Sequence, residues 1–234
     1  MAATEKGVWD LQDVRDKQLA SEWTYDAVDP GTMWSWGMNA APSSRGGWLG
    51  HNNTTDYSSP TQVGTDTTWT RLEGTSGEGN TSLALKSDGT LWMWGQNSQG
   101  QSAQNDTAQR SSPTQVGTDT DWGYEEGKLG GNGDNTTFNI KTDGTLWGWG
   151  NNDGGQLGVP GTPQSSPIQV GTDNNWDYLP PNGGKSEYNN MMAAIKTDGT
   201  LWTWGWKKNG GLGHNEHGGP SGDQDPYSSP KQLG

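Results

Sequence analysis

Histidines are the residues of this chain whose spacing most directly suggests chemistry. There are three, His51, His214 and His217, and the last two lie three positions apart in the stretch HNEH. A zinc site needs three or four ligands held in a fixed geometry, and this stretch lies among glycines, with no helix to align the two rings. We therefore expect exposed loops at these histidines, with no metal and no cofactor bound.

Acidic pairs and glycine-rich stretches are the other candidates for chemistry. Glu125 and Glu126 are adjacent, whereas the paired carboxylates of glycoside hydrolysis face each other across a groove. The stretch GKLGGNG at 127–133 lacks the residue order of a phosphate-binding loop. Three further aspartates each precede a glycine at the same repeat position and are expected in turns: Asp88, Asp143 and Asp198. The sequence predicts a protein that is not an enzyme.

A tryptophan motif recurs along the chain and organises it. The stretch DGTLWMWG recurs as DGTLWGWG and DGTLWTWG, and a weaker first copy reads DPGTMWSWG. The first tryptophans of the copies lie at positions 34, 92, 147 and 202, which are 58, 55 and 55 residues apart. Such a period indicates a repeat architecture. The predicted core of the repeats is Trp34, Trp36, Trp92, Trp94, Trp147, Trp149, Trp202 and Trp204.

A second motif, SSPxQVG, closes each repeat. It begins at Ser58, Ser111 and Ser165, and the variant SSPKQLG begins at Ser228. Each repeat is thus about 55 residues long. The two motifs predict an N-terminal segment followed by one partial and three full repeats, with the bounds 1–28, 29–64, 65–117, 118–171 and 172–234.

The local chemistry of each repeat predicts β-structure. Short apolar runs such as LALK end in Ser/Thr-Asp-Gly, the signature of a two-residue hairpin, and LWxWG is the returning strand. Alternation places Trp92 and Trp94 on one face and Leu91 and Met93 on the other, so both faces are expected to be buried between stacked sheets. We predict an all-β fold, a β-propeller of four repeats with one small sheet per repeat.

The repeat resembles that of the regulator of chromosome condensation family. The stretch KTDGTLWGWGNNDGGQLG at 141–158, followed by SSPIQVG, is similar to the family pattern DGxLWxWGxNxxGQLG…SPxxV. The resemblance covers about 29–234 and implies a propeller, usually of seven blades. Because this chain has fewer repeats, three closures stay open: residues 1–28 complete its own ring, two copies share a ring, or a neighbouring protein caps an open array. The resemblance also implies nucleotide exchange on a small GTPase as one function.

The composition disfavours several classes of partner. The 234 residues carry 14 Lys+Arg and 27 Asp+Glu, a net charge of −13, which disfavours nucleic acid and anionic membrane surfaces. The chain has no cysteine for a disulfide or a thiolate metal site, and no apolar run long enough for membrane insertion. Only 27% of the residues are hydrophobic, but 15 are tryptophan, so aromatic rings are expected to build the core.

Residues 1–28 break the repeat pattern and are a candidate attachment arm. Their apolar residues are spaced as in a short amphipathic helix. The alternative is a degenerate half-blade, because Trp9 precedes Trp34 by 25 residues, as Trp122 precedes Trp147. The stretch GVWDLQDVRDKQLASEW resembles short N-terminal segments of structural proteins of tailed bacteriophages. The candidate arm residues are Val8, Trp9, Leu11, Val14 and Leu19.

Two tryptophans outside the repeated core, Trp48 and Trp206, lie in loops and are candidate surface-binding residues, since such rings stack on sugars or anchor protein contacts. Together with the arm, these two residues favour a virion structural protein that serves as a tail-fibre, head-decoration or host-contact module. Its partners would be other virion proteins, further copies of itself, and a host glycan or receptor. The alternative is a cytoplasmic protein-interaction propeller that regulates or inhibits a partner protein. A lectin-like propeller is a third hypothesis.

Overall fold

The chain forms β-strands throughout the part that can be described. The computed structural model describes residues 31–39, 46–74, 81–131, 135–180, 190–207, 210–216 and 226–234. Within these ranges there are fourteen strands and no helix, which confirms the all-β prediction. The candidate arm and its predicted helix lie outside the described residues.

The strands form one two-stranded sheet and three four-stranded sheets, each an antiparallel meander in chain order. The first sheet contains β1 (Trp34–Gly37) and β2 (Tyr57–Gln62). The second contains β3 (Trp69–Gly74), β4 (Thr81–Lys86), β5 (Leu91–Gly95) and β6 (Arg110–Gln115). The third contains β7 (Leu129–Gly131), β8 (Thr136–Ile140), β9 (Leu146–Gly150) and β10 (Gln164–Gln169). The fourth contains β11 (Trp176–Tyr178), β12 (Met191–Lys196), β13 (Leu201–Gly205) and β14 (Tyr227–Gln232).

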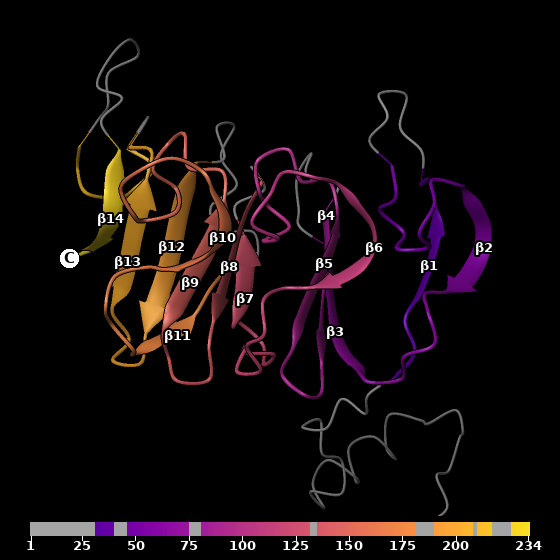
Figure 1. The fold of residues 1–234 in the computed structure, drawn as a ribbon. Coiled ribbons are helices and arrows are strands. Elements are labelled where there is room, and N and C mark those ends of the chain that lie inside the picture. The colour runs from indigo at the N-terminus through magenta and orange to yellow at the C-terminus, as the bar shows by residue number, and fades with distance from the viewer. Residues whose placement is uncertain are drawn as a thin grey trace, which may run out of the picture.

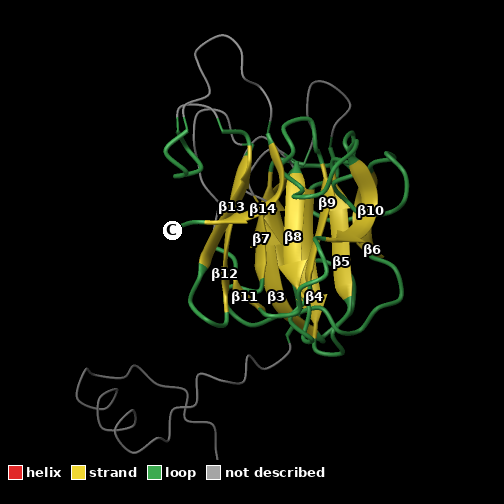
Figure 2. Ribbon diagram, turned by 90° about the vertical axis from the view of Figure 1, so that its left-hand side faces the viewer, coloured by secondary structure: helices red, strands yellow, loops and turns green. Residues whose placement is uncertain are grey.

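The four sheets stand in a row like the blades of a propeller. Figure 1 shows β1 and β2 at one end of the row and β14 at the other. Figure 2, turned by 90°, looks at the molecule from the β13–β14 end, with the strands of earlier sheets behind. The predicted propeller architecture with one small sheet for each of four repeats is thus confirmed. The row has two different ends, and each end presents a different part of the repeat.

The Asp-Gly-Thr motif forms the hairpin between the second and third strands of each four-stranded sheet. The backbone N–H of Lys86 donates to Thr90 O (3.0 Å), so three residues form the connection, and the prediction of a two-residue hairpin is wrong. The reason is that Gly89 takes a left-handed conformation, φ 78°, after a tight turn. The Asp88 carboxylate accepts from the Thr90 hydroxyl (2.6 Å), and that hydroxyl accepts from the Trp92 indole N–H (2.9 Å). The motif therefore fixes the turn and the first tryptophan together.

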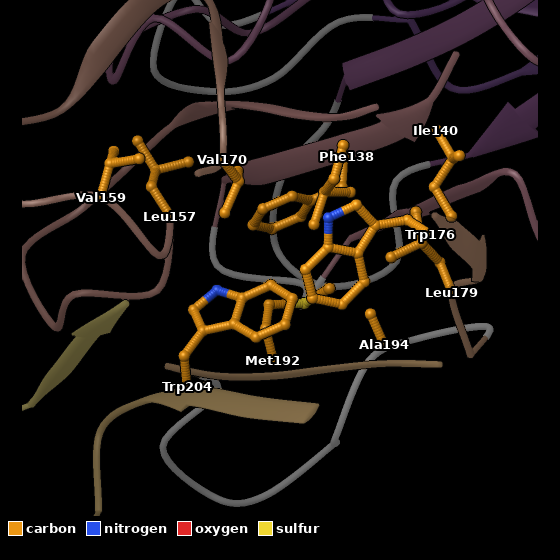
Figure 3. Close-up of a cluster of buried hydrophobic side chains, with 11 residues drawn as sticks. Phe138, Ile140, Leu157, Val159, Val170, Trp176, Leu179, Met192, Ala194 and Trp204 are labelled. Atoms are coloured by element: carbon orange, nitrogen blue, oxygen red, sulfur yellow. The ribbon is translucent and has the colours of Figure 1, made fainter. Parts of the chain in front are cut away.

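The hydrophobic core lies between neighbouring sheets, and aromatic rings build it, as the composition predicts (Figure 3). Phe138, Trp176 and Trp204 are each 2% exposed or less. They meet edge to face, with centroid distances of 5.9 Å for Phe138–Trp204 and 6.1 Å for Trp176–Trp204. Trp122 and Trp149 form the equivalent contact one boundary earlier, at 5.8 Å. Because each such ring removes about 150–250 Å² from water, few aliphatic side chains are needed.

The first repeat departs from the predicted core. Leu91, Met93 and Trp94 of the second sheet are at most 2% exposed, as expected for a strand covered on both faces. In contrast, Trp34 and Trp36 are 48% and 59% exposed, so the prediction that these two residues are core is wrong. The physical reason is that, among the described residues, no earlier sheet packs against β1.

The hairpin carboxylates predict an acid-dependent stability. The hydrogen bond from the Thr145 hydroxyl lowers the pKa of Asp143, so the stabilisation is present above the unfolded pKa of about 3.9. It is lost as the pH falls through the lower folded pKa. We expect Asp143→Ala to reduce the free energy of unfolding near neutral pH, with the difference from wild type vanishing at the most acidic pH. Urea denaturation across a pH series measures this.

Asp153→Ala provides the control for this experiment, because Asp153 is an exposed carboxylate outside the hairpins. It is expected to leave the stability close to wild type at every pH. A loss in Asp143→Ala that persists unchanged in acid would contradict the role assigned to the ionised carboxylate.

Candidate functional site

One hydrogen bond recurs at the boundaries between sheets. The second tryptophan of an LWxWG strand donates its indole N–H to a backbone carbonyl in the loop of the preceding repeat. The pairs are Trp94 with Trp48 O (2.7 Å), Trp149 with Gln101 O (3.0 Å) and Trp204 with Gln156 O (2.9 Å). The three donor rings are at most 2% exposed. A buried N–H requires an acceptor, so this bond fixes each loop against the next sheet.

The acceptor loop makes a tight turn that leaves room for the indole ring. Two residues after the acceptor, Gly50 and Gly158 have φ values of 82° and 70°, and Ala103 takes the same place with φ 57°. A Cβ added to Gly158 would lie 2.8 Å from Trp204 Nε1. Even the methyl group of an alanine would therefore displace the incoming tryptophan at this position.

A buried asparagine holds each of these loops in shape. Asn152 is 4% exposed, and its side-chain oxygen accepts from the backbone N–H of Leu157 (3.0 Å). The equivalent pairs are Asn97 with Ser102 (2.9 Å) and Asn39 with Leu49 (2.9 Å). Because the asparagine lies two residues after the end of the LWxWG strand, the strand of one repeat and its own loop form one rigid unit.

A lysine lies between two tryptophans in each four-stranded sheet. Lys86 Nζ is 3.8 Å from the ring centroid of Trp92 and 4.7 Å from that of Trp69, and it pairs with Asp66 at 2.9 Å. Lys141 and Lys196 repeat the arrangement. Burial lowers the pKa of Lys141, but its hydrogen bonds to Asp119 and Asp121 outweigh that effect and leave the pKa raised. Lys141 is thus a charged structural group.

Large apolar side chains are exposed on the first sheet. Trp34, Trp36 and Met38 are 48%, 59% and 62% exposed, and we call these three residues the β1 surface. In the three later repeats, the tryptophans equivalent to Trp34 are half-buried and those equivalent to Trp36 are buried. Sequence reasoning missed this surface because the motif around it is the same as in the buried copies.

A cleft of ≈ 340 Å³ lies between the first and second sheets. Trp69 and Trp92 line it together with Val63, and the Asp66 carboxylate is the acidic group in its wall. Val63 directly follows β2, the strand paired with β1. The cleft is therefore part of the boundary between the first and second sheets.

The two predicted surface-binding tryptophans lie in different settings from those expected. Trp48 is half-buried, and its contribution to the boundary is its backbone carbonyl, which accepts from Trp94 and from the Ser82 hydroxyl (3.0 Å). Trp206 is also half-buried, and its backbone N–H donates to Asn190 O (2.7 Å). The structure does not bring the two side chains together, and their binding role stays a prediction.

The histidines contact hydroxyl groups at one repeat position. His51 Nε2 lies 3.0 Å from Ser35 Oγ, and His214 Nε2 lies 3.0 Å from Thr203 Oγ1. Both rings are half-buried, so the expectation of exposed loops is wrong for them; each ring packs on a tyrosine. Burial lowers the pKa of His214. His217 lies outside the described residues.

The described residues contain no group of three His, Cys, Asp or Glu side chains that could hold a metal ion. Glu125 and Glu126 are exposed on a turn. Within the same ranges, no helix is long and apolar enough to cross a membrane. The structure therefore offers contact surfaces as its candidate sites.

Two stretches of the chain, residues 76–101 and 143–177, match the regulator of chromosome condensation (RCC1) repeat. These two stretches are similar to RCC1 repeats. The chain is 28% identical over 137 residues to protein RCC2 of Mus musculus, covering 58% of this chain and 25% of that protein. It is 29% identical over 147 residues to the mitochondrial RCC1 domain-containing protein RUG3 of Arabidopsis thaliana, covering 60% and 30%. The chain thus spans less than a third of these relatives.

Solved structures show the same fold. The chain matches yeast RCC1 (Prp20), solved bound to Kap60, with a TM-score of 0.64 and 18% identity over 87% of this chain and 46% of that one. It matches human WBSCR16 with a TM-score of 0.57 and 20% identity over 80% and 44%. No relative named here is a virion protein. The bacteriophage resemblance rests on residues outside the described ranges, so placement in a virion stays a prediction.

The boundary bond predicts a stability difference between two tryptophans at one repeat position. Trp204→Ala removes a fully buried ring and its bond to Gln156, so we expect a loss of about 3–5 kcal/mol in the free energy of unfolding. Trp36→Ala is the matched control, because this ring is 59% exposed, and it is expected to cost less than about 1 kcal/mol. Denaturant titrations at low protein concentration test both, and equal losses would contradict the boundary role.

Proposed function

We propose that this chain is a non-enzymatic protein-interaction module that uses its RCC1-type repeats as a rigid scaffold. The observation that carries the proposal is the β1 surface, where Trp36 is 59% exposed although its equivalents are buried in the later repeats. Large exposed apolar patches mark interaction sites, and tryptophan is enriched at the centre of protein interfaces. The protein-interaction alternative therefore fits better than display on a virion.

The β1 surface is preorganised for binding. The Trp34 indole donates to the Thr32 hydroxyl (2.8 Å), and Trp34 and Ser35 pair with Gln62 and Thr61 of β2. Holding aromatic rings in place before a partner arrives reduces the entropy that binding costs. A partner that buries the Trp34 ring would thus lose less side-chain entropy on binding than with a freely rotating ring.

The charge of the chain indicates the chemistry of the partner. Exposed aspartates lie in the hairpins of the four-stranded sheets: Asp88, Asp143 and Asp198. Hydrogen bonds from threonine hydroxyls lower the pKa of these three carboxylates, so they are ionised at neutral pH. With a net charge of −13, this acidic edge favours contacts with lysine and arginine, which would be attracted over long range, whereas the β1 surface itself is uncharged.

The structural relatives agree with this class of function without specifying the partner. Yeast RCC1 was solved bound to Kap60, and a second structure, of Prp20p from Saccharomyces cerevisiae, is titled with its binding to Gsp1p and histones. Those partners belong to those proteins, which share at most 18% identity with this chain. For this chain we propose protein binding in general, through a surface of its own.

The test compares two sets of exposed apolar residues. Crosslinking and mass spectrometry identify a bound protein, and calorimetry then measures its affinity. We expect the double variant Trp34→Ser/Met38→Ser to weaken binding at least about 10-fold, because interface centres concentrate the binding energy. Leu72→Ser is the matched control, since Leu72 is 54% exposed on β3, away from the β1 surface. Loss of binding in the control alone would reject the assigned surface.

A further inference from the structure

The boundaries between sheets are directional, with a different part on each side. One side, which we call the head, is the second tryptophan of an LWxWG strand. The other side, which we call the tail, is the loop of the preceding repeat. It offers the acceptor carbonyl and, two residues later, the glycine or alanine over which the ring lies. Within the chain, three heads fill three tails: Trp94, Trp149 and Trp204 donate to the loops of the repeats before them. The described row of sheets therefore has one unused head at its beginning and one unused tail at its end.

Exposure identifies the unused head and the unused tail. Trp36 is 59% exposed, against 2% or less for the three internal heads. Gly213, the small residue of the last tail, is exposed, whereas its equivalents Gly50, Ala103 and Gly158 are buried. The two unused parts lie on the first and last sheets, at opposite ends of the row (Figure 1).

The unused tail already has the shape that receives a tryptophan. Gly210 and Gly213 have φ values of 72° and 77°, close to 68° and 70° for Gly155 and Gly158 of the filled tail. In both loops the second glycine donates its N–H to the carbonyl of the first, at 3.0 Å and 3.1 Å. The Thr203 hydroxyl also fixes this loop by donating to Leu212 O (2.8 Å). The backbone at these two glycines therefore matches that of a filled tail.

We propose that copies of this chain associate head to tail, with the Trp36 indole N–H of one copy donating to the Gly211 carbonyl of the next. The ring would then lie over Gly213, as the Trp204 ring lies over Gly158. This inference rests on the proposed function, because it uses the β1 surface as a binding surface and names a second copy as its occupant. The contact is heterologous, since the two copies contribute different surfaces.

A second bond supports the same register. At two internal boundaries, a backbone N–H next to the tail donates to the first serine of the following SSP motif: Asn52 to Ser111 O (2.7 Å) and Asn105 to Ser165 O (2.6 Å). Asn215 has the same left-handed backbone, with φ 56° against 58° and 57°. The first serine of the first repeat, Ser58, is exposed. Docking Trp36 on the tail therefore brings the Asn215 N–H to the Ser58 carbonyl of the other copy.

A second copy is the favoured occupant because both halves of the contact are present on one chain. The contact repeats a junction that the chain makes three times internally with the same donor ring, and the polar bond beside it is present at two of these three boundaries. Each added copy would extend the row by its own set of sheets. Depending on the rotation between successive copies, the assembly either closes into a ring or grows as a filament.

The first experiment measures the mass of the full chain by analytical ultracentrifugation over a concentration series. We expect an assembly whose mass is a multiple of 25.1 kDa. Trp36→Glu and Gly213→Glu are each expected to raise the dissociation constant at least about 30-fold, because one removes the head and the other fills the tail. Leu72→Glu is the matched control and is expected to associate like wild type, since it adds the same charge at a side chain that is 54% exposed on β3, away from both the head and the tail.

Mixing the two glutamate variants tests the direction of the contact. Trp36→Glu keeps its tail and Gly213→Glu keeps its head, so an equimolar mixture is expected to form a complex of one copy of each, while neither associates alone. Failure of the mixture to associate would overturn the head-to-tail arrangement in favour of a symmetric contact. Association of either variant at wild-type strength would overturn the assigned residues, and a wild-type chain that stays monomeric at every concentration would overturn the inference itself.

A photocrosslinking residue in place of Met38, which is 62% exposed beside the head, separates the two proposals. Crosslinks to the peptide containing Leu212 support the second copy as occupant. Crosslinks to a different protein, with a monomeric wild type, would overturn the self-association and leave the proposed protein-binding function intact. No crosslinked protein of either kind would reject both.

Discussion

The hydrogen bond from a buried indole N–H to the carbonyl of the preceding repeat is the interaction on which the structure depends. It joins residues 46 to 48 positions apart, so no single repeat makes it alone. The ring that donates the bond also fills the space between two sheets. One side chain therefore sets the position of the loop and also fills the boundary, and the sheets can stack only in the register that satisfies this bond.

The lysine between two tryptophans complements this junction within each sheet. Its stem and ammonium group cover aromatic faces, while the carboxylates of the segment entering the sheet neutralise its charge. A polar residue thus occupies space that an aliphatic residue fills in most cores. Together with the 15 tryptophans, this explains how a chain with little aliphatic content builds a continuous core.

The repeat motif was enough to predict the all-β fold, the number of sheets and the aromatic core, because period, hairpin signal and strand alternation agreed. It could not predict that the Trp34 and Trp36 side chains are exposed, since burial depends on a neighbouring sheet and not on the strand that carries the ring. The three-residue turn was missed because Asp-Gly suits both hairpin lengths, and only the Gly89 conformation distinguishes them. The function of Trp48 in the boundary was hidden because its backbone, not its side chain, makes the contact.

That last feature gives two roles to one position of the repeat. The acceptor position is occupied by Trp48, Gln101, Gln156 and Gly211 in the four repeats, and any amino acid offers the same carbonyl. The side chains of Gln101 and Gln156 are buried, and each accepts a hydrogen bond from a backbone N–H of its own loop, at 2.8 Å. One residue thus shapes its loop through its side chain and joins that loop to the next sheet through its backbone, so selection on the side chain acts on the fold of the loop and leaves the joining bond unchanged.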